Sequence, residues 1–98
     1  MVKITSQIEV GLNPVRVVYS KAERGSLVIA NTSDTATLYY GADNQVTTAN
    51  GIPILPKTNV GFLRGLGDRP DLERWLVSDT PGVDVRIGEE DLEEGEGL

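Results

Sequence analysis

The chain has 98 residues, of which fifteen are acidic and nine basic, for a formal net charge of −6, and it contains neither His nor Cys. This length fits one domain with one modest core, and the missing residue types exclude thiol chemistry, disulfides, and histidine as a catalytic base or metal ligand. The negative charge argues against nucleic-acid binding, and no apolar run approaches the ~20 residues of a membrane helix or forms a signal-peptide core.

Alternation of apolar and polar residues predicts two strands at the start of the chain. Residues 2–10 place Val2, Ile4, Ile8 and Val10 on one phase, which is typical of a half-buried strand. Asn13-Pro14 then favours a turn, and residues 15–19 alternate again.

A hairpin is predicted next. Residues 27–30 are a continuous apolar run, which favours a central strand covered on both faces. The Asn31–Asp34 segment has four turn-favouring side chains, and its match to a glycosylation sequon is better explained by the turn. Residues 35–40 alternate again, so we expect strands 26–31 and 35–40 to pair, with Tyr39 and Tyr40 on opposite faces.

The second half of the chain predicts further strands after a polar loop, residues 41–51. The two prolines of residues 52–56 indicate an edge strand or connector, because proline cannot donate to the ladder. Residues 58–64 predict a strand, and 65–71 a loop in which Asp71 could cap one helical turn.

Residues 74–78 and 83–87 predict a final hairpin, with Trp75 as the largest core residue. The whole pattern gives about seven short antiparallel strands at roughly 10-residue spacing. We therefore expect an all-β fold, either a β-sandwich (jelly-roll or Ig-like) or a small barrel.

The negative charge is concentrated at the C-terminal end. Residues 88–98 hold six acids and no base, so residues 1–87 balance nine acids against nine bases. We predict one domain over 1–87 and an acidic tail over 88–98, flexible and disordered unless it docks on a basic partner through Leu92. On this interpretation, deleting residues 88–98 leaves thermal stability almost unchanged.

Candidate catalytic and metal sites are sparse. Most acids of residues 1–87 fall in turns or on the polar phase of strands, which argues against a catalytic carboxylate pair. Asp34, Asp43 or Asp79 could contribute to a Ca²⁺ site, but no dense Asp-x-Asp array supports one. No glycine pattern fits a phosphate-binding loop. We predict no enzymatic activity, no cofactor and no metal.

Several segments share a recognisable pattern of turns and strands. The segments are Arg24–Asp34, Leu38–Gly41, Val46–Pro56, Asp71–Val77 and Val83–Ile87. Over residues 24–87 the chain resembles small structural proteins of tailed bacteriophages and archaeal tailed viruses. The Ile54-Leu55 pair departs from this pattern, where a single Leu is usual before Pro, and the acidic tail has no counterpart.

The resemblance implies a virion protein assembled in the host cytoplasm, either a capsid decoration, head-fibre, turret or tail-associated protein. It implies self-association as a trimer or pentamer and binding to major capsid or other virion proteins, with no nucleic acid and no membrane. A neutral body also allows copies to pack without net repulsion. The candidate interaction residues are Tyr39, Tyr40, Asp43, Asn44, Arg64, Glu89, Glu90, Asp91 and Leu92.

Two other functions remain open. The chain could be a carbohydrate- or receptor-binding module that uses Tyr39 or Tyr40 and the 41–51 loop, because aromatic faces stack on the apolar faces of sugars. It could also be an accessory domain of an enzyme. A glycan screen tests the first of these, and the oligomeric state tests the second.

Overall fold

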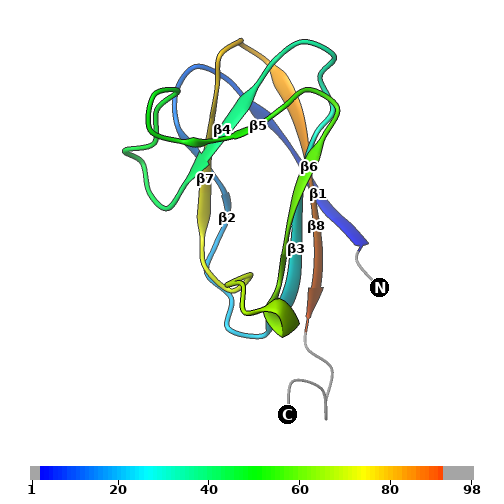
Figure 1. The fold of residues 1–98 in the computed structure, drawn as a ribbon. Coiled ribbons are helices and arrows are strands. Elements are labelled where there is room, and N and C mark those ends of the chain that lie inside the picture. Colours follow the sequence, from blue (N-terminus) through cyan, green and yellow to red (C-terminus); the bar gives the residue numbers. More distant parts are fainter. Residues whose placement is uncertain (1–2, 92–98) are drawn as a thin grey trace.

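Within residues 3–91, eight strands form two four-stranded antiparallel sheets that face each other (Figure 1). A computed structural model describes residues 3–91, with side chains for residues 6–91. The first sheet has the order β1 (Lys3–Val10), β8 (Val83–Asp91), β3 (Arg24–Asn31) and β6 (Asn59–Leu63). The second has the order β2 (Val15–Val18), β7 (Arg74–Ser78), β4 (Leu38–Gly41) and β5 (Ile52–Ile54). The all-β prediction is confirmed.

The core lies between the sheets and follows the predicted phases. Val83, Val85 and Ile87 of β8 are buried, as is Leu38 of β4. In β3, Leu27 and Ile29 face the core, whereas the outward Val28 and Ala30 are only half-buried. β3 is thus an interior strand as expected, but its outer face is not fully covered.

The predicted hairpin of 26–31 and 35–40 is wrong, because β3 and β4 belong to different sheets. The buried Asn31 ends β3, and its Nδ2 donates to the carbonyls of Ala36 and Ile54 at 2.8 and 3.0 Å. The main chain of Ala36 donates to Ser33 Oγ at 2.9 Å. These bonds hold the connection as an arch between the sheets, built from the same turn-favouring residues that a hairpin would use.

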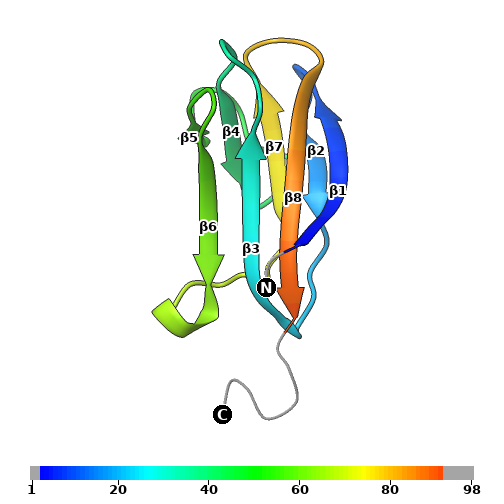
Figure 2. The same cartoon turned by 90° about the vertical axis from the view of Figure 1, so that its right-hand side faces the viewer.

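The predicted hairpin of 74–78 and 83–87 is also wrong, since β7 and β8 lie in opposite sheets. Asp79 fixes this second arch to the first, accepting from the Thr37 N–H at 3.1 Å and donating its own N–H to the Thr37 carbonyl at 3.2 Å. Both arches lie at the same end of the molecule, at the top of Figure 2.

β8 continues to Asp91, four residues past the boundary at residue 87 that we predicted between domain and acidic tail. Gly88 and Glu89 pair with both β1 and β3, and Asp91 pairs with Arg24. Arg24 and Lys21 supply the opposite charge that lets these acids remain in a sheet. The rest of the expected tail, Leu92 included, lies outside the described residues.

Smaller differences follow from irregular backbone. A register shift between Arg16 and Val18 turns both Val17 and Val18 inward and leaves Tyr19 65% exposed. The short 3₁₀ turn η1 (Arg64–Leu66) follows β6, and Asp71 caps no helix. β5 lies at the edge of the second sheet, as the two prolines of residues 52–56 predicted, and β6 lies at the edge of the first sheet. Within residues 3–91, no helix is long and apolar enough to cross a membrane.

Trp75 is not the core residue that we predicted. It lies on the outer face of β7, half-buried, with its Nε1–H donating to Glu73 Oε2 at 2.7 Å. The inward phase of β7 is taken by Arg74, Leu76 and Ser78, all of which are buried. The strand therefore directs a charged guanidinium inward and the indole outward, which alternation alone does not predict.

Candidate functional site

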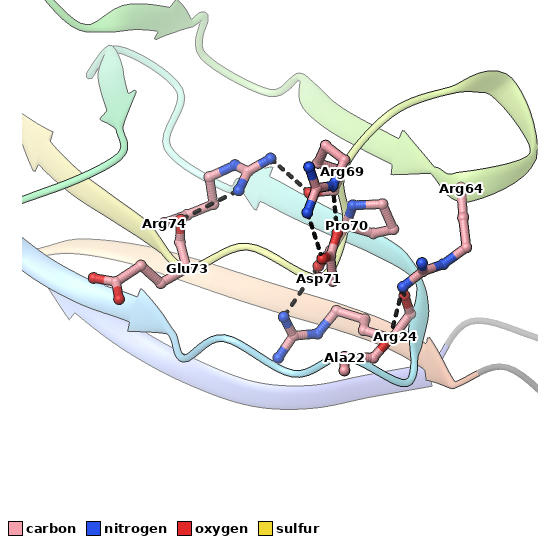
Figure 3. A network of polar contacts seen from close by, with 8 residues as sticks. All are labelled: Ala22, Arg24, Arg64, Arg69, Pro70, Asp71, Glu73 and Arg74. Atoms are coloured by element: carbon pink, nitrogen blue, oxygen red, sulfur yellow. Dashed lines mark hydrogen bonds and ion pairs between the residues drawn. The ribbon is translucent and has the colours of Figure 1, made fainter.

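Arginine side chains hold the segment that joins β6 to β7 (Figure 3), at the end of the molecule opposite the arches (Figure 2). Arg24 is only 3% exposed, and its two terminal nitrogens donate to the Pro70 and Tyr19 carbonyls at 3.1 and 3.0 Å. Its Nε donates to Glu89 Oε1 at 2.6 Å. All three sides of the guanidinium are thus satisfied, as burial of a cation requires.

Arg64 and Arg74 extend this network. Arg64 Nη2 donates to the carbonyls of Ala22 and Arg24 at 2.7 and 3.0 Å. Arg74 donates to the carbonyls of Glu73 and Arg69 at 3.2 and 2.9 Å. Arginine side chains therefore supply hydrogen bonds to these main-chain carbonyls, which strand pairing supplies elsewhere in the fold.

Arg69 and Asp71 form a paired fork on the same segment, with two nitrogen–oxygen contacts of 3.1 and 3.0 Å. The hydrogen bonds from Arg69 lower the pKa of Asp71 from 3.8 to about 2. Asp71 is thereby ionised across the ordinary pH range, and its carbonyl accepts from the Lys21 N–H at 2.9 Å. This main-chain bond ties the 64–73 segment to the turn before β3.

A groove of about 600 Å³ opens beside this network, between the edges of the two sheets. Tyr40 from β4 and Phe62 from β6 meet edge to face there, with ring centres 5.6 Å apart. The Arg74 guanidinium lies 4.4 Å from the Phe62 ring centre, and burial lowers the Arg74 pKa. Among residues 3–91, Arg74 forms no ion pair, so carbonyls and the aromatic ring hold its charge.

Exposed apolar side chains are frequent in the segments around β5 and β6. We call the surface formed by Ile52, Leu55, Leu63, Leu66 and Leu72 the β5–β6 side. These are five of the seven large hydrophobic side chains that are exposed within residues 6–91, and they come from one quarter of the chain. Ile52 and Leu72 also line the groove. Most of the exposed large apolar side chains within residues 6–91 thus come from the segments around β5 and β6, and we take these segments as the candidate site.

The predicted aromatic and loop residues are divided between two faces. Tyr40 packs against the core and lines the groove, whereas Tyr39 lies on the outer face of β4, next to Gly51. Asp43 Oδ1 accepts from the Gln45 N–H at 2.9 Å, and Asn44 Oδ1 accepts from Gln45 Nε2 at 3.1 Å. Asp43 and Asn44 thus shape the 42–51 loop and do not lie with Tyr40.

The predicted charged residues lie with the arginine network. Arg64 bonds the main chain before β3, and Glu89 is the ionic partner of Arg24. Glu90 lies in β8 opposite Ser26, and Asp91 pairs with Lys21 at 2.9 Å, which raises the Lys21 pKa. Leu92 lies outside the described residues. The chosen residues therefore belong to three separate places.

Sequence reasoning missed Phe62, Arg74 and the buried Val46 of the 42–51 loop. Arg74 shares the inward phase of Leu76, which was an available signal. Val46 contacts the main chain near Gly41 and Gly51, where an added Cβ would meet its side chain at 2.8 and 2.9 Å. No short-range pattern predicts that a polar loop folds back over its own sheet.

Potential metal and modification sites are accounted for by local bonds. No group of three acidic residues close enough to hold a metal occurs within residues 3–91. Asp34 pairs with Lys57 at 3.4 Å. Asn31 is 2% exposed with its Nδ2 bonded, so the sequon lies at the arch after β3, in place of the predicted hairpin turn.

No family model, curated protein or solved structure matches this chain. The resemblance to tailed-virus proteins therefore stays a prediction. A proposal for the function has to be argued from the β5–β6 side.

Proposed function

We propose that the protein is a non-enzymatic structural component of a tailed-virus virion, of the capsid decoration or turret type. In this proposal it self-associates and binds the capsid or tail lattice. The resemblance over residues 24–87 gives the class, and the observation that carries the proposal is the exposed apolar β5–β6 side.

The strand order supports the proposal at the level of architecture. Two four-stranded sheets of order β1-β8-β3-β6 and β2-β7-β4-β5 are the arrangement of a jelly roll, which viral capsid proteins and lectins use. Architecture alone does not specify function, because one fold carries many sites. The exposed apolar side chains of the β5–β6 side are the feature that favours a packing module over a ligand-binding module.

The apolar side chains are costly to leave in water. Leu66 is 75% exposed at the tip of η1, and Ile52 and Leu55 are more than half exposed around β5. Burying a leucine stabilises a contact by roughly 1.5–3 kcal/mol. Several such side chains on one side provide the apolar centre of a modest interface.

The proposal is tested by cosedimentation with particles of the virus that encodes the chain, with mass spectrometry of the purified virion. Leu66→Lys is expected to reduce particle binding at least about tenfold, since it places a charge in the buried centre of the contact. Leu12→Lys is the matched control, because Leu12 is 59% exposed and far from the β5–β6 side in sequence. Absence of the protein from virions, or equal binding by both variants, contradicts the proposal.

A second candidate is carbohydrate binding, favoured by an aromatic surface on the outer face of the second sheet. The Arg16 guanidinium lies 3.9 Å from the Tyr19 ring centre and 5.7 Å from that of Trp75. Aromatic faces with a polar rim stack well on sugars. A glycan array with wild type and Tyr19→Ala tests it: specific binding that Tyr19→Ala abolishes favours this function, and no binding removes it.

A further inference from the structure

We propose that β6 pairs edge to edge with β6 of a second copy, so that the first sheets of two molecules join into one continuous antiparallel sheet. This deepens the self-association of the proposed function and rests on it. Within residues 3–91, the two sheets have four edge strands, which are β1 and β6 in one sheet and β2 and β5 in the other (Figure 2).

Three of these edges carry the features that proteins use to prevent pairing with other chains. β1 and β2 each contain a register shift, between Ile4 and Ser6 and between Arg16 and Val18. β5 has only three residues, and the central one is Pro53. Bulges, short strands and proline all interrupt a row of main-chain donors and acceptors.

β6 has none of these features. Its five residues, Asn59–Leu63, contain no charge and no proline, and they pair with β3 without a register shift. An exposed regular edge of this kind is a template for another strand.

The direction of the main-chain groups follows from one hydrogen bond. The Asn31 N–H donates to the Thr58 carbonyl at 2.9 Å, in the same register that pairs Ile29 with Val60. Because such bonds alternate along an antiparallel pair, residues 58, 60 and 62 bond to β3 and residues 59, 61 and 63 point away from it. Asn59 and Gly61 are exposed. No other residue within residues 3–91 forms a hydrogen bond with the outward main-chain groups of these two residues.

The main-chain groups of the third outward residue, Leu63, are already hydrogen-bonded within the same chain. Its N–H donates to Asp68 Oδ2 at 3.1 Å, and its carbonyl accepts from the Asp68 N–H at 3.2 Å. Only Asn59 and Gly61 therefore remain to pair with an added strand. This restricts the register, because an antiparallel copy can satisfy both residues only when Asn59 lies opposite the partner's Gly61.

A second copy fits this edge better than an unrelated segment. With Val60 on the twofold axis, each Asn59 meets the partner's Gly61, and about four hydrogen bonds form. The cations on either side are already engaged: Lys57 pairs with Asp34, and Arg64 points to main-chain carbonyls of its own chain. No like charges therefore meet across the axis.

The apolar residues at the two ends of β6 are complementary under the same twofold axis. Leu55 precedes the strand, and Leu63 and Leu66 follow it, all three exposed. Antiparallel pairing brings the start of one β6 beside the end of the other, so the Leu55 region meets the partner's Leu66 region. Such a contact is isologous and closes as a dimer, unlike the trimer or pentamer that the resemblance implies.

Sedimentation equilibrium on the full chain tests the proposal. Gly61→Lys is the test variant, because a Cβ at Gly61 meets only ordinary contacts at 3.9 and 4.0 Å, whereas two lysines would meet near the axis. Gly11→Lys is the matched control, with nothing within 4 Å of its Cβ. We expect a wild-type dimer, a dimer Kd at least about tenfold higher for Gly61→Lys, and no change for Gly11→Lys.

A monomeric or trimeric wild type overturns the proposal, as does a Gly61→Lys variant that dimerises like wild type. Circular dichroism checks that both variants fold. If dimerisation fails while the Leu66→Lys particle assay succeeds, only the β6 contact is wrong and the proposed function stands.

A second experiment tests the register and does not depend on Gly61→Lys. Residues on the axis form a non-hydrogen-bonded pair with Cα atoms about 4.5 Å apart, which a disulfide can join. Since the chain has no Cys, oxidised Val60→Cys is expected to give a covalent dimer, and Gln7→Cys on the exposed face of β1 is not. Equal cross-linking of the two variants, or none of Val60→Cys, contradicts the register.

Discussion

Arg24 joins three separate parts of the chain. Its guanidinium contacts Glu89 of β8, Pro70 of the 64–73 segment and Tyr19 after β2. A planar group with five donors suits this position, since lysine offers a single point of charge. Because Arg24 is 3% exposed, its removal would take one buried donor each from two carbonyls and from the Glu89 carboxylate.

Arg24→Met is therefore expected to reduce the free energy of unfolding by about 3 kcal/mol, the effect of breaking a buried ion pair. Urea denaturation measures this. The control is Arg86→Met, because Arg86 is half-exposed and pairs with Asp84 at 3.5 Å, a surface pair worth at most about 1 kcal/mol. Equal losses for the two variants would contradict a special role for Arg24.

Asp71 predicts an acid-sensitive contact. Arg69 lowers the folded-state pKa of Asp71 from 3.8 to about 2, so the pair stabilises the fold above pH 4, and this contribution is lost as pH falls from about 4 to 2. Asp71→Asn is expected to be less stable than wild type at pH 6 and to converge on it near pH 2. Urea denaturation as a function of pH measures the difference, and a pH-independent gap would show that the charge of Asp71 is not involved.

Among the elements, β8 shows how partners change the interpretation of a charged segment. Residues 88–91 appear as the start of an acidic tail, yet β1, β3, Lys21 and Arg24 hold them in the sheet. A run of acids predicts a solvated terminus only while no base lies near it, and the bases here are about 65 residues earlier in the chain.

A truncation series tests this account of β8. A chain that ends at Gly88 loses the Glu89 and Asp91 contacts, so its melting temperature is expected to fall by at least about 5 °C relative to a chain that ends at Asp91. Differential scanning calorimetry of both chains gives the comparison. Identical melting temperatures would restore the original boundary at residue 87.

The arches show which part of the fold could not be predicted. Alternation correctly predicted the inward faces of residues 36–40 and 83–87. It could not choose between a hairpin and an arch, because Asn31 and Ser33 make local turn bonds in either case. For the same reason Tyr40 could be predicted to face inward, but its contact with Phe62 could not.

At the scale of the whole molecule, the charge is distributed differently from the sequence-based division. Residues 3–91 contain twelve acids and nine bases, so the described body is moderately negative, whereas residues 1–87 balance. Two copies therefore repel weakly at long range, and the uncharged β6 is where they can approach most closely.

Salt dependence tests this view of self-association. Raising ionic strength from about 0.1 M to 1 M shortens the Debye length from about 10 to 3 Å, which screens the repulsion between copies and leaves main-chain pairing intact. The dimer Kd is expected to stay constant or fall. Sedimentation equilibrium in both buffers measures it, and a Kd that rises tenfold would show that ion pairs hold the copies together.

The opening composition excludes histidine and cysteine chemistry, and alternation by itself determined that the chain is built of short strands with particular inward faces. Both are local properties, fixed by residue type and by the two-residue period of a strand. The tertiary structure alone decided which strands are neighbours, that residues 88–91 belong to the sheet, and that β6 is the unprotected edge. These depend on contacts between residues far apart in sequence, such as Arg24 with Glu89, whose free energy no short window of sequence contains.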